Sequence, residues 1–158
     1  MLKKFINLEE AAVLAESTRK QKKTVALANG AFDILHVGHI RYLQASKECA
    51  DLLIVAVNSD ASVRGYKGEG RPVIPDHERA ELICALECVD HVVVFPEATV
   101  ENVIKAIRPN YQCKGTDYTE ESVPEGDLVR SLGGQVKIVG DPKDHDSSAI
   151  IRKINQAG

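Results

Sequence analysis

Short apolar runs separated by helix-length segments constrain the fold of this chain more than any other feature. Residues 52–57 (LLIVAV) and 91–95 (HVVVF) are the clearest runs, and they lack the polar-apolar alternation of a half-exposed sheet. The other candidate strands are TVALA (24–28), YQCKG (111–115, as a strand edge) and QVKIV (135–139). Strands of this kind alternating with helices are typical of parallel sheets. The sequence therefore predicts an α/β fold: a Rossmann-like doubly wound parallel sheet of about five strands with helices on both faces.

The segments between these runs are predicted to be helices, with one exception. Residues Asn7 to Glu10 (NLEE) form a capping-box pattern that opens a helix ending near Lys20. Further helices are expected over 36–49, over 76–89 with Asp76 as N-cap, over 99–107 with Thr99 as cap, around 124–132, and over 147–155. The exception is SVRGYKGEGRPVIP (62–75), which we expect to be a glycine-rich, basic loop.

Size, charge and cysteine usage limit the class of protein. A chain of 158 residues suits one domain, here residues 1–158, with an N-terminal helix in 1–23 and a catalytic core over 24–154. A net charge of −3 argues against a nucleic-acid or membrane-surface partner. No apolar run approaches the length of a membrane span, and the N-terminus lacks the apolar core of a signal peptide. The four cysteines form no CxxC pair, so a reduced, cytoplasmic setting is expected.

The stretch ANGAFDILHVGHIRYL (28–43) carries the strongest functional signal. It leaves the end of the first strand and enters a helix, where free N–H groups and the helix dipole favour phosphate. His36 and His39 are three residues apart and can face the same way, while Gly38 lets a ligand approach the backbone. Two alternatives are a chance pair of surface histidines and a metal site, although the HExxH spacing is absent. No P-loop or dinucleotide fingerprint occurs.

Two other segments are predicted to reach the same crevice. Lys67 and Arg71 in GYKGEGR (65–71) could place a cation over a polyphosphate, or the segment could be a solvated loop. Asp146, Ser147 and Ser148 precede the last helix, where they could form a second anion cradle or a simple cap.

Five segments in order resemble the cytidylyltransferase-like nucleotidyltransferases with the HxGH signature. They are NGAFDILHVGHIRYL, VAVNSDASVRGYKGEGRPV, HERAELICALECVD, KGTDYT and DSSAIIRKI, and they extend from about residue 24 to 154. Within this superfamily the sequence is most similar to the bacterial heptose 1-phosphate adenylyltransferases. The sequence departs from the family pattern at four places. Ala31 stands where many relatives have cysteine, and Thr116 stands where KGGDY is usual. Ser148-Ala149 replaces a common Thr-Thr pair, and Lys143 or His145 lies near the position of an arginine in cytidylyltransferases.

The resemblance implies roles for individual residues. His36, His39 and Lys67 would be catalytic, the histidines by stabilising the transition state and the lysine from a mobile loop. The implied nucleotide-binding residues are Phe32, Asp33, Gly38, Arg79, Lys114, Gly115, Asp117, Tyr118, Ser147 and Ser148. No protein side chain is expected to bind the metal, Mg²⁺, which would be held mainly by the nucleotide phosphates.

The resemblance also implies a reaction and partners. ATP and D-glycero-β-D-manno-heptose 1-phosphate would give ADP-heptose and pyrophosphate. The alternative enzyme is glycerol-3-phosphate cytidylyltransferase or another nucleotidyltransferase that acts on a sugar or alcohol phosphate. A nucleotide-binding regulatory module is the alternative without catalysis. Because 158 residues leave no room for a kinase domain, we expect a separate sugar kinase to make the 1-phosphate, and we expect a homodimer.

Overall fold

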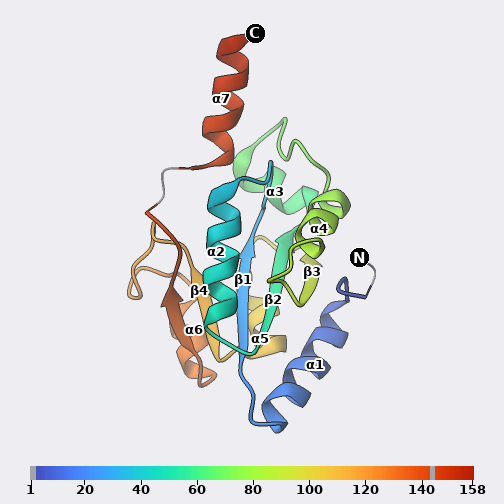
Figure 1. The fold of residues 1–158 in the computed structure, drawn as a ribbon, viewed down its shortest axis with the longest axis vertical. Coiled ribbons are helices and arrows are strands. Elements are labelled where there is room, and N and C mark those ends of the chain that lie inside the picture. The colour runs from blue at the N-terminus through green and yellow to red at the C-terminus, as the bar shows by residue number, and fades with distance from the viewer. Residues whose placement is uncertain (1–2, 143–144) are drawn as a thin grey trace.

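The computed structural model describes residues 3–142 and 145–158 and contains a five-stranded parallel sheet in the order β3-β2-β1-β4-β5 (Figure 1). Its strands are β1 (Val25–Gly30), β2 (Leu52–Asn58), β3 (His91–Phe95), β4 (Tyr111–Lys114) and β5 (Gln135–Ile138). The chain builds outward from β1 to β3, then returns to the other side of β1 for β4 and β5. The predicted parallel α/β fold is confirmed. The reversal beside β1 is the switch point at which such sheets bind ligands.

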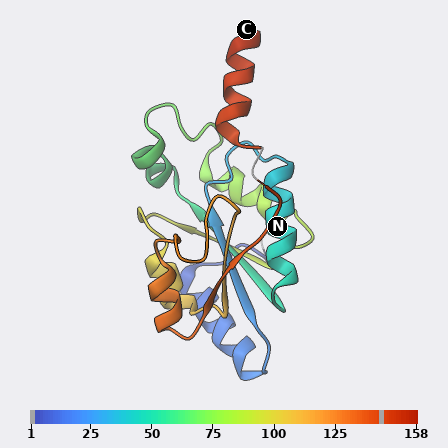
Figure 2. The ribbon, with the colours of Figure 1, turned by 90° about the vertical axis from the view of Figure 1, so that its left-hand side faces the viewer.

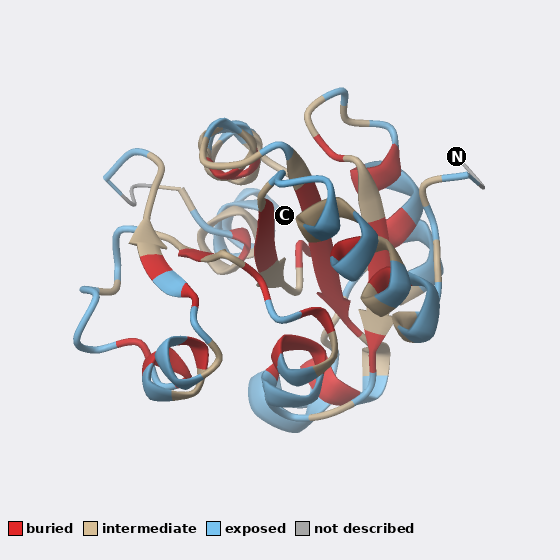
Figure 3. Ribbon diagram, turned by 90° about the horizontal axis from the view of Figure 1, so that it is seen from below, coloured by how far each residue is buried: buried red, intermediate tan, exposed pale blue. Residues whose placement is uncertain are grey.

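Helices cover both faces of the sheet. Helices α1 (Leu8–Lys20), α5 (Glu101–Ile107) and α6 (Gly126–Ser131) pack on one face, and α2 (Val37–Glu48) and α4 (Asp76–Cys84) on the other. Strand residues alternate between these layers: Val25 and Leu27 join the first core cluster, Ala26 and Ala28 the second. Figure 3 shows the buried strands between helices whose outer sides are exposed.

Helix α7 (Ser147–Ala157) projects from the body, beyond the carboxyl ends of the strands (Figures 1 and 2). Ser147 is the only buried residue of α7, and residues 152–158 are all exposed. The first turn of α7 therefore makes its connection to the rest of the molecule.

The predicted loop over 62–75 is wrong in its first half, where α3 (Asp60–Lys67) forms. The Ser59 side chain caps this helix by accepting from the Ser62 backbone N–H at 3.2 Å. Val63 is fully buried, so the helix also has a packed face. The glycines suggested a loop, but capping and burial outweigh the cost of Gly65 inside the helix, about 1 kcal/mol.

Several predicted boundaries also differ from the structure. Helix α4 ends at Cys84 rather than Val89, and its N-cap is Pro75 because Asp76 is already helical. The Asp76 carboxylate instead accepts the Asp60 backbone N–H at 2.9 Å. The N-cap of α5 is Val100 rather than Thr99, with no side-chain hydrogen bond to the helix. Strand β4 is not at an edge, since it pairs with both β1 and β5.

None of the helices in the described part of the chain is both long enough and apolar enough to cross a membrane.

Candidate active site

A cavity of about 550 Å³ opens at the carboxyl ends of the strands. Its walls come from the segments after β1, β4 and β5, from the end of α3 and from the start of α7. This volume is typical of a site for one small molecule. Most of the predicted site residues line it: Phe32, Asp33, His36, Gly38, His39, Lys67, Lys114, Gly115, Asp117, Tyr118 and Ser147.

The two histidines of HVGH build the N-terminus of α2. The Nδ1 atom of His36, the N-cap, accepts the Gly38 backbone N–H at 3.1 Å. In return, the Nδ1 atom of His39 accepts the backbone N–H of His36 at 3.3 Å. The two rings stack with their centroids 3.8 Å apart. The spacing of this motif is therefore that of a reciprocal cap, made with imidazoles in place of the usual hydroxyl and carboxylate.

This capping arrangement also selects the histidine tautomers. A nitrogen that accepts a backbone N–H carries no proton of its own, so each neutral ring holds its proton on Nε2. Nε2 is then a hydrogen-bond donor in both residues, and both residues line the cavity. Two oriented imidazole donors at a helix N-terminus suit the charge on a phosphoryl group.

The loop before HVGH is held in a strained conformation. Phe32 and Ile34 both have left-handed backbone angles, with φ of 54° and 47°. Such a conformation costs a β-branched residue such as Ile34 about 1–3 kcal/mol, so surrounding contacts must hold it.

Asp33 supplies these contacts. Its carboxylate accepts the backbone N–H groups of Val73 at 2.8 Å and Ile74 at 3.0 Å, and Nε of Arg71 at 3.3 Å. Burial raises the pKa of Asp33, but these hydrogen bonds and the guanidinium outweigh it, and the net pKa is lowered. Asp33 therefore remains a carboxylate whose two oxygens are both engaged by the 71–74 segment.

The start of α7 is attached to the same corner. The Ser147 hydroxyl donates to the Asp33 backbone carbonyl, and Nη1 of Arg71 donates to the Ser148 hydroxyl oxygen at 3.3 Å. Asp146 caps α7 by accepting the Ala149 N–H at 2.6 Å. Two helix N-termini, those of α2 and α7, thus border one cavity.

At the far side of the cavity a buried ion pair fixes the segment after β4. The Lys114 ammonium lies 2.6 Å from the Glu125 carboxylate, with the two side chains only 11% and 10% exposed. Lys114 also lies 5.2 Å from the centre of the Tyr118 ring. Thr116 donates to the Asp141 backbone carbonyl at 2.8 Å, which ties this segment to the chain after β5.

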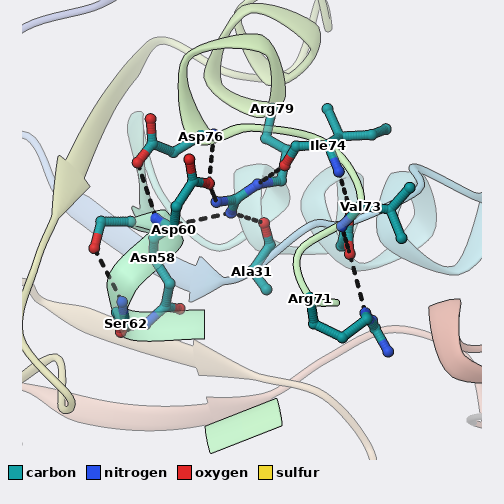
Figure 4. A network of polar contacts seen from close by, with 11 residues as sticks. Ala31, Asn58, Asp60, Ser62, Arg71, Val73, Ile74, Asp76 and Arg79 are labelled. Atoms are coloured by element: carbon teal, nitrogen blue, oxygen red, sulfur yellow. Dashed lines mark hydrogen bonds and ion pairs between the residues drawn. The ribbon is translucent and has the colours of Figure 1, made fainter. Parts of the chain in front are cut away.

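Arg79 is not among the residues that line the cavity. Figure 4 shows its side chain within a network of polar contacts. Its side chain is fully buried, and it donates to the carbonyls of Ile74, Ala31 and Asn58 at 2.8, 2.6 and 2.8 Å and to the Asp60 carboxylate at 2.9 Å. Four of its five N–H groups are thereby used by the protein. Ser148 is likewise outside the cavity lining.

Lys67 is the last residue of α3 and lines the cavity together with Tyr66, rather than lying within a glycine loop. Its side chain is exposed, with Nζ 6.0 Å from the centre of the Tyr66 ring. The glycines that follow it, Gly68 and Gly70, have positive φ angles.

The cysteines are not placed as nucleophiles. All four are free thiols. Burial raises the pKa of Cys84 and Cys88, and it raises that of Cys113 to about 12. Thiols held protonated in this way are poor nucleophiles.

Within residues 3–142 and 145–158, no group of three or more histidine, cysteine, aspartate or glutamate side chains is arranged to hold a metal ion.

Several residues that line the cavity were not predicted from the sequence. Glu125, Tyr66 and Arg41 do so, but no motif or spacing marks them. His145 also lines the cavity, although the sequence indicated it only as a departure from the family pattern. Lys143, the other residue of that departure, lies outside the described residues. A histidine two residues before the paired serines was the available signal for His145.

Comparison with known proteins places the chain in a family. A family model described as Cytidylyltransferase-like matches residues 27–154. "Bifunctional protein HldE" of Geobacter sulfurreducens is 44% identical over 154 residues, which are 98% of this chain and 31% of that protein. The protein of the same name from Syntrophotalea carbinolica is 46% identical over 139 residues, 88% of this chain and 28% of that protein. The chain thus spans about a third of the length of these curated relatives.

A solved structure agrees with this placement. The crystal structure of the lipopolysaccharide core biosynthesis protein from Thermoplasma volcanium matches with a TM-score of 0.64 and 32% identity, covering 77% of this chain and 99% of that one. Because the family model spans most of the chain and includes the HVGH motif and the start of α7, the chain belongs to the cytidylyltransferase-like family.

Proposed function

We propose that this chain is a nucleotidyltransferase that transfers AMP from ATP to D-glycero-β-D-manno-heptose 1-phosphate, releasing ADP-heptose and pyrophosphate. The observation that carries the proposal is the reciprocal cap of His36 and His39. This cap leaves Nε2 as the donor of each ring, and both residues line a cavity that the N-terminus of α7 also borders. Such a site suits the binding of a polyphosphate at its reacting end.

The proposed reaction is an in-line displacement at the α-phosphorus. A phosphate oxygen of the sugar 1-phosphate forms a bond to this phosphorus, and the bond to the oxygen bridging the α- and β-phosphates breaks. The electron pair leaves with pyrophosphate. His36 and His39 would stabilise the charge that develops, and Lys67 would bind the polyphosphate from the rim of the cavity. No covalent intermediate on the protein is required.

Mg²⁺ would bind together with the triphosphate, held mainly by phosphate oxygens and water, as is usual for this ion. When bound, it would neutralise part of the phosphate charge. The steps assigned to the protein's own residues do not depend on its position.

The choice of acceptor rests on similarity. The family places the chain among nucleotidyltransferases, and the relatives include bifunctional HldE proteins and a lipopolysaccharide core biosynthesis protein. These names support a sugar phosphate as acceptor. CTP with glycerol 3-phosphate is the alternative pair, since the described residues that line the cavity include no group that selects adenine over cytosine.

We further propose that these residues fold as one domain, which acts in the cytoplasm as a homodimer. Helix α1 supports the single domain, because Ala11 and Ala15 are fully buried in the core that α5 and α6 share.

Pyrophosphate release tests the enzyme class. We expect release only when Mg²⁺, a nucleoside triphosphate and a sugar phosphate are all present, because the displaced group is pyrophosphate. Nucleotide binding without turnover on any acceptor would instead favour a regulatory module. A coupled pyrophosphatase assay with each component omitted in turn separates the two.

A further inference from the structure

A third histidine joins the HVGH pair in space. Of the five histidines in the chain, three line the cavity: His36, His39 and His145. The rings of His36 and His145 meet edge to face, with their centroids 6.3 Å apart and their planes at 89°. His145 comes from the start of α7, far from the other two in the sequence.

Gly38 permits this approach. A Cβ atom at position 38 would lie 2.9 Å from Cε1 of His36 and 3.3 Å from the Cβ of His145. Any side chain there would press against both histidines. The glycine of HVGH therefore admits the α7 segment to the N-terminus of α2.

The backbone next to His145 is anchored. Asp146 caps α7, and the Ser147 side chain donates to the backbone carbonyl of Asp33. Ser147 is only 7% exposed. His145 thus extends from a segment that is attached to the strained loop before HVGH, not from a free terminus.

We propose that His145 is a further substrate-binding residue, which donates a hydrogen bond from its imidazole to the β- or γ-phosphate of the nucleoside triphosphate. This inference rests on the proposed function. The N-terminus of α7 favours negative charge beside it, and an imidazole has at least one N–H donor in either protonation state. His36 and His39 would contact the α-phosphate, and His145 would bind the β- and γ-phosphates that leave as pyrophosphate.

Isothermal titration calorimetry with inorganic pyrophosphate, α,β-methylene ATP and AMP, all in Mg²⁺ buffer, tests this assignment. We expect His145→Ala to weaken binding of pyrophosphate and of the ATP analogue roughly 10- to 100-fold, the scale for losing a hydrogen bond to a charged group. AMP lacks the β- and γ-phosphates, so its affinity should change less than threefold. His145→Gln keeps an N–H donor and should recover part of the loss.

His77→Ala is the matched control, because His77 is exposed on α4 and does not line the cavity. Wild-type affinity for pyrophosphate in His145→Ala would overturn the inference. So would an equal loss of AMP affinity, which indicates a general collapse of the cavity. If His145→Ala does not fold, His145→Leu, which also removes the N–H donor, replaces it and is judged by the same criteria.

These titrations need no acceptor and no turnover. If the wild-type chain forms no nucleotide-sugar but binds pyrophosphate in a manner that depends on His145, the proposed function fails and the inference stands. If the wild-type chain binds neither pyrophosphate nor the ATP analogue, the inference itself fails.

Discussion

Replacing His36 or His39 by alanine is expected to lower kcat about 10²–10³-fold, the usual effect of losing one preorganised donor to a transition state. Each imidazole is fixed by a backbone N–H on Nδ1, so its Nε2 proton needs no reorientation during the reaction. Steady-state kinetics under saturating substrates measures the effect.

His36 is also the N-cap of α2, and its removal should cost about 1 kcal/mol of stability. His36→Asn separates this effect from catalysis, because asparagine is among the best capping residues but cannot supply the Nε2 donor at the same position. We expect the asparagine variant to regain stability while kcat stays low. A wild-type kcat in His36→Asn would show that the histidine serves only the helix.

Arg79→Met is expected to reduce the free energy of unfolding by about 3–5 kcal/mol, because several hydrogen-bond acceptors lose a donor at a cost of about 1–3 kcal/mol each. The guanidinium is fully buried, and its loss would remove the Arg79 hydrogen bonds from three backbone carbonyls and from the Asp60 carboxylate, which would keep its bond from the Asp76 backbone N–H. These acceptors belong to Ala31, Asn58, Asp60 and Ile74, which lie in four different segments of the chain (Figure 4). Urea denaturation of the protein without nucleotide measures the change.

Arg152→Met, on the exposed part of α7, should change stability by less than about 0.5 kcal/mol and controls for the loss of an arginine. Arg79→Lys keeps the charge but not the planar fork, so it should recover only part of the stability. Near-wild-type stability in Arg79→Met, together with a large loss of ATP affinity, would contradict the structural role and favour a direct triphosphate contact.

The sequence predicted the sheet well because its signal is local. Strand β2 is apolar from Leu52 to Val57 and is buried on both faces from Leu53 onward. Strand β3 has the predicted bounds, His91–Phe95. Helix α1 likewise begins after Asn7, whose side chain accepts the Glu10 N–H at 2.8 Å. Capping and hydrophobic runs are properties of neighbouring residues, and the sequence displays them directly.

The predicted loop and the predicted N-cap were wrong where contacts outside the obvious sequence pattern determine the structure. Helix α3 forms despite its glycine because Ser59 caps it and Val63 is buried. Asp76 does not cap α4, since its carboxylate bonds to Asp60 in a different helix. No pattern within either segment signals that pairing.

The parts of the site that lie close together in the sequence were also predictable, and the contacts between distant segments were not. HVGH was identified because a strand end, a glycine and two histidines lie within a few residues. The burial of Arg79, the pairing of Lys114 with Glu125, and the meeting of His145 with His36 depend on the folded chain. Spacing in the sequence cannot specify such contacts.

Product identification tests the central claim most directly. The protein is incubated with Mg²⁺, with either ATP or CTP, and with either heptose 1-phosphate or glycerol 3-phosphate, and the products are identified by mass spectrometry. We expect ADP-heptose as the main product, with at least tenfold preference for ATP, because a buried donor left unpaired by the wrong base costs about 1–3 kcal/mol. CDP-glycerol as the main product would contradict the heptose assignment, and no product from any of the four pairs would contradict transfer to either of these acceptors.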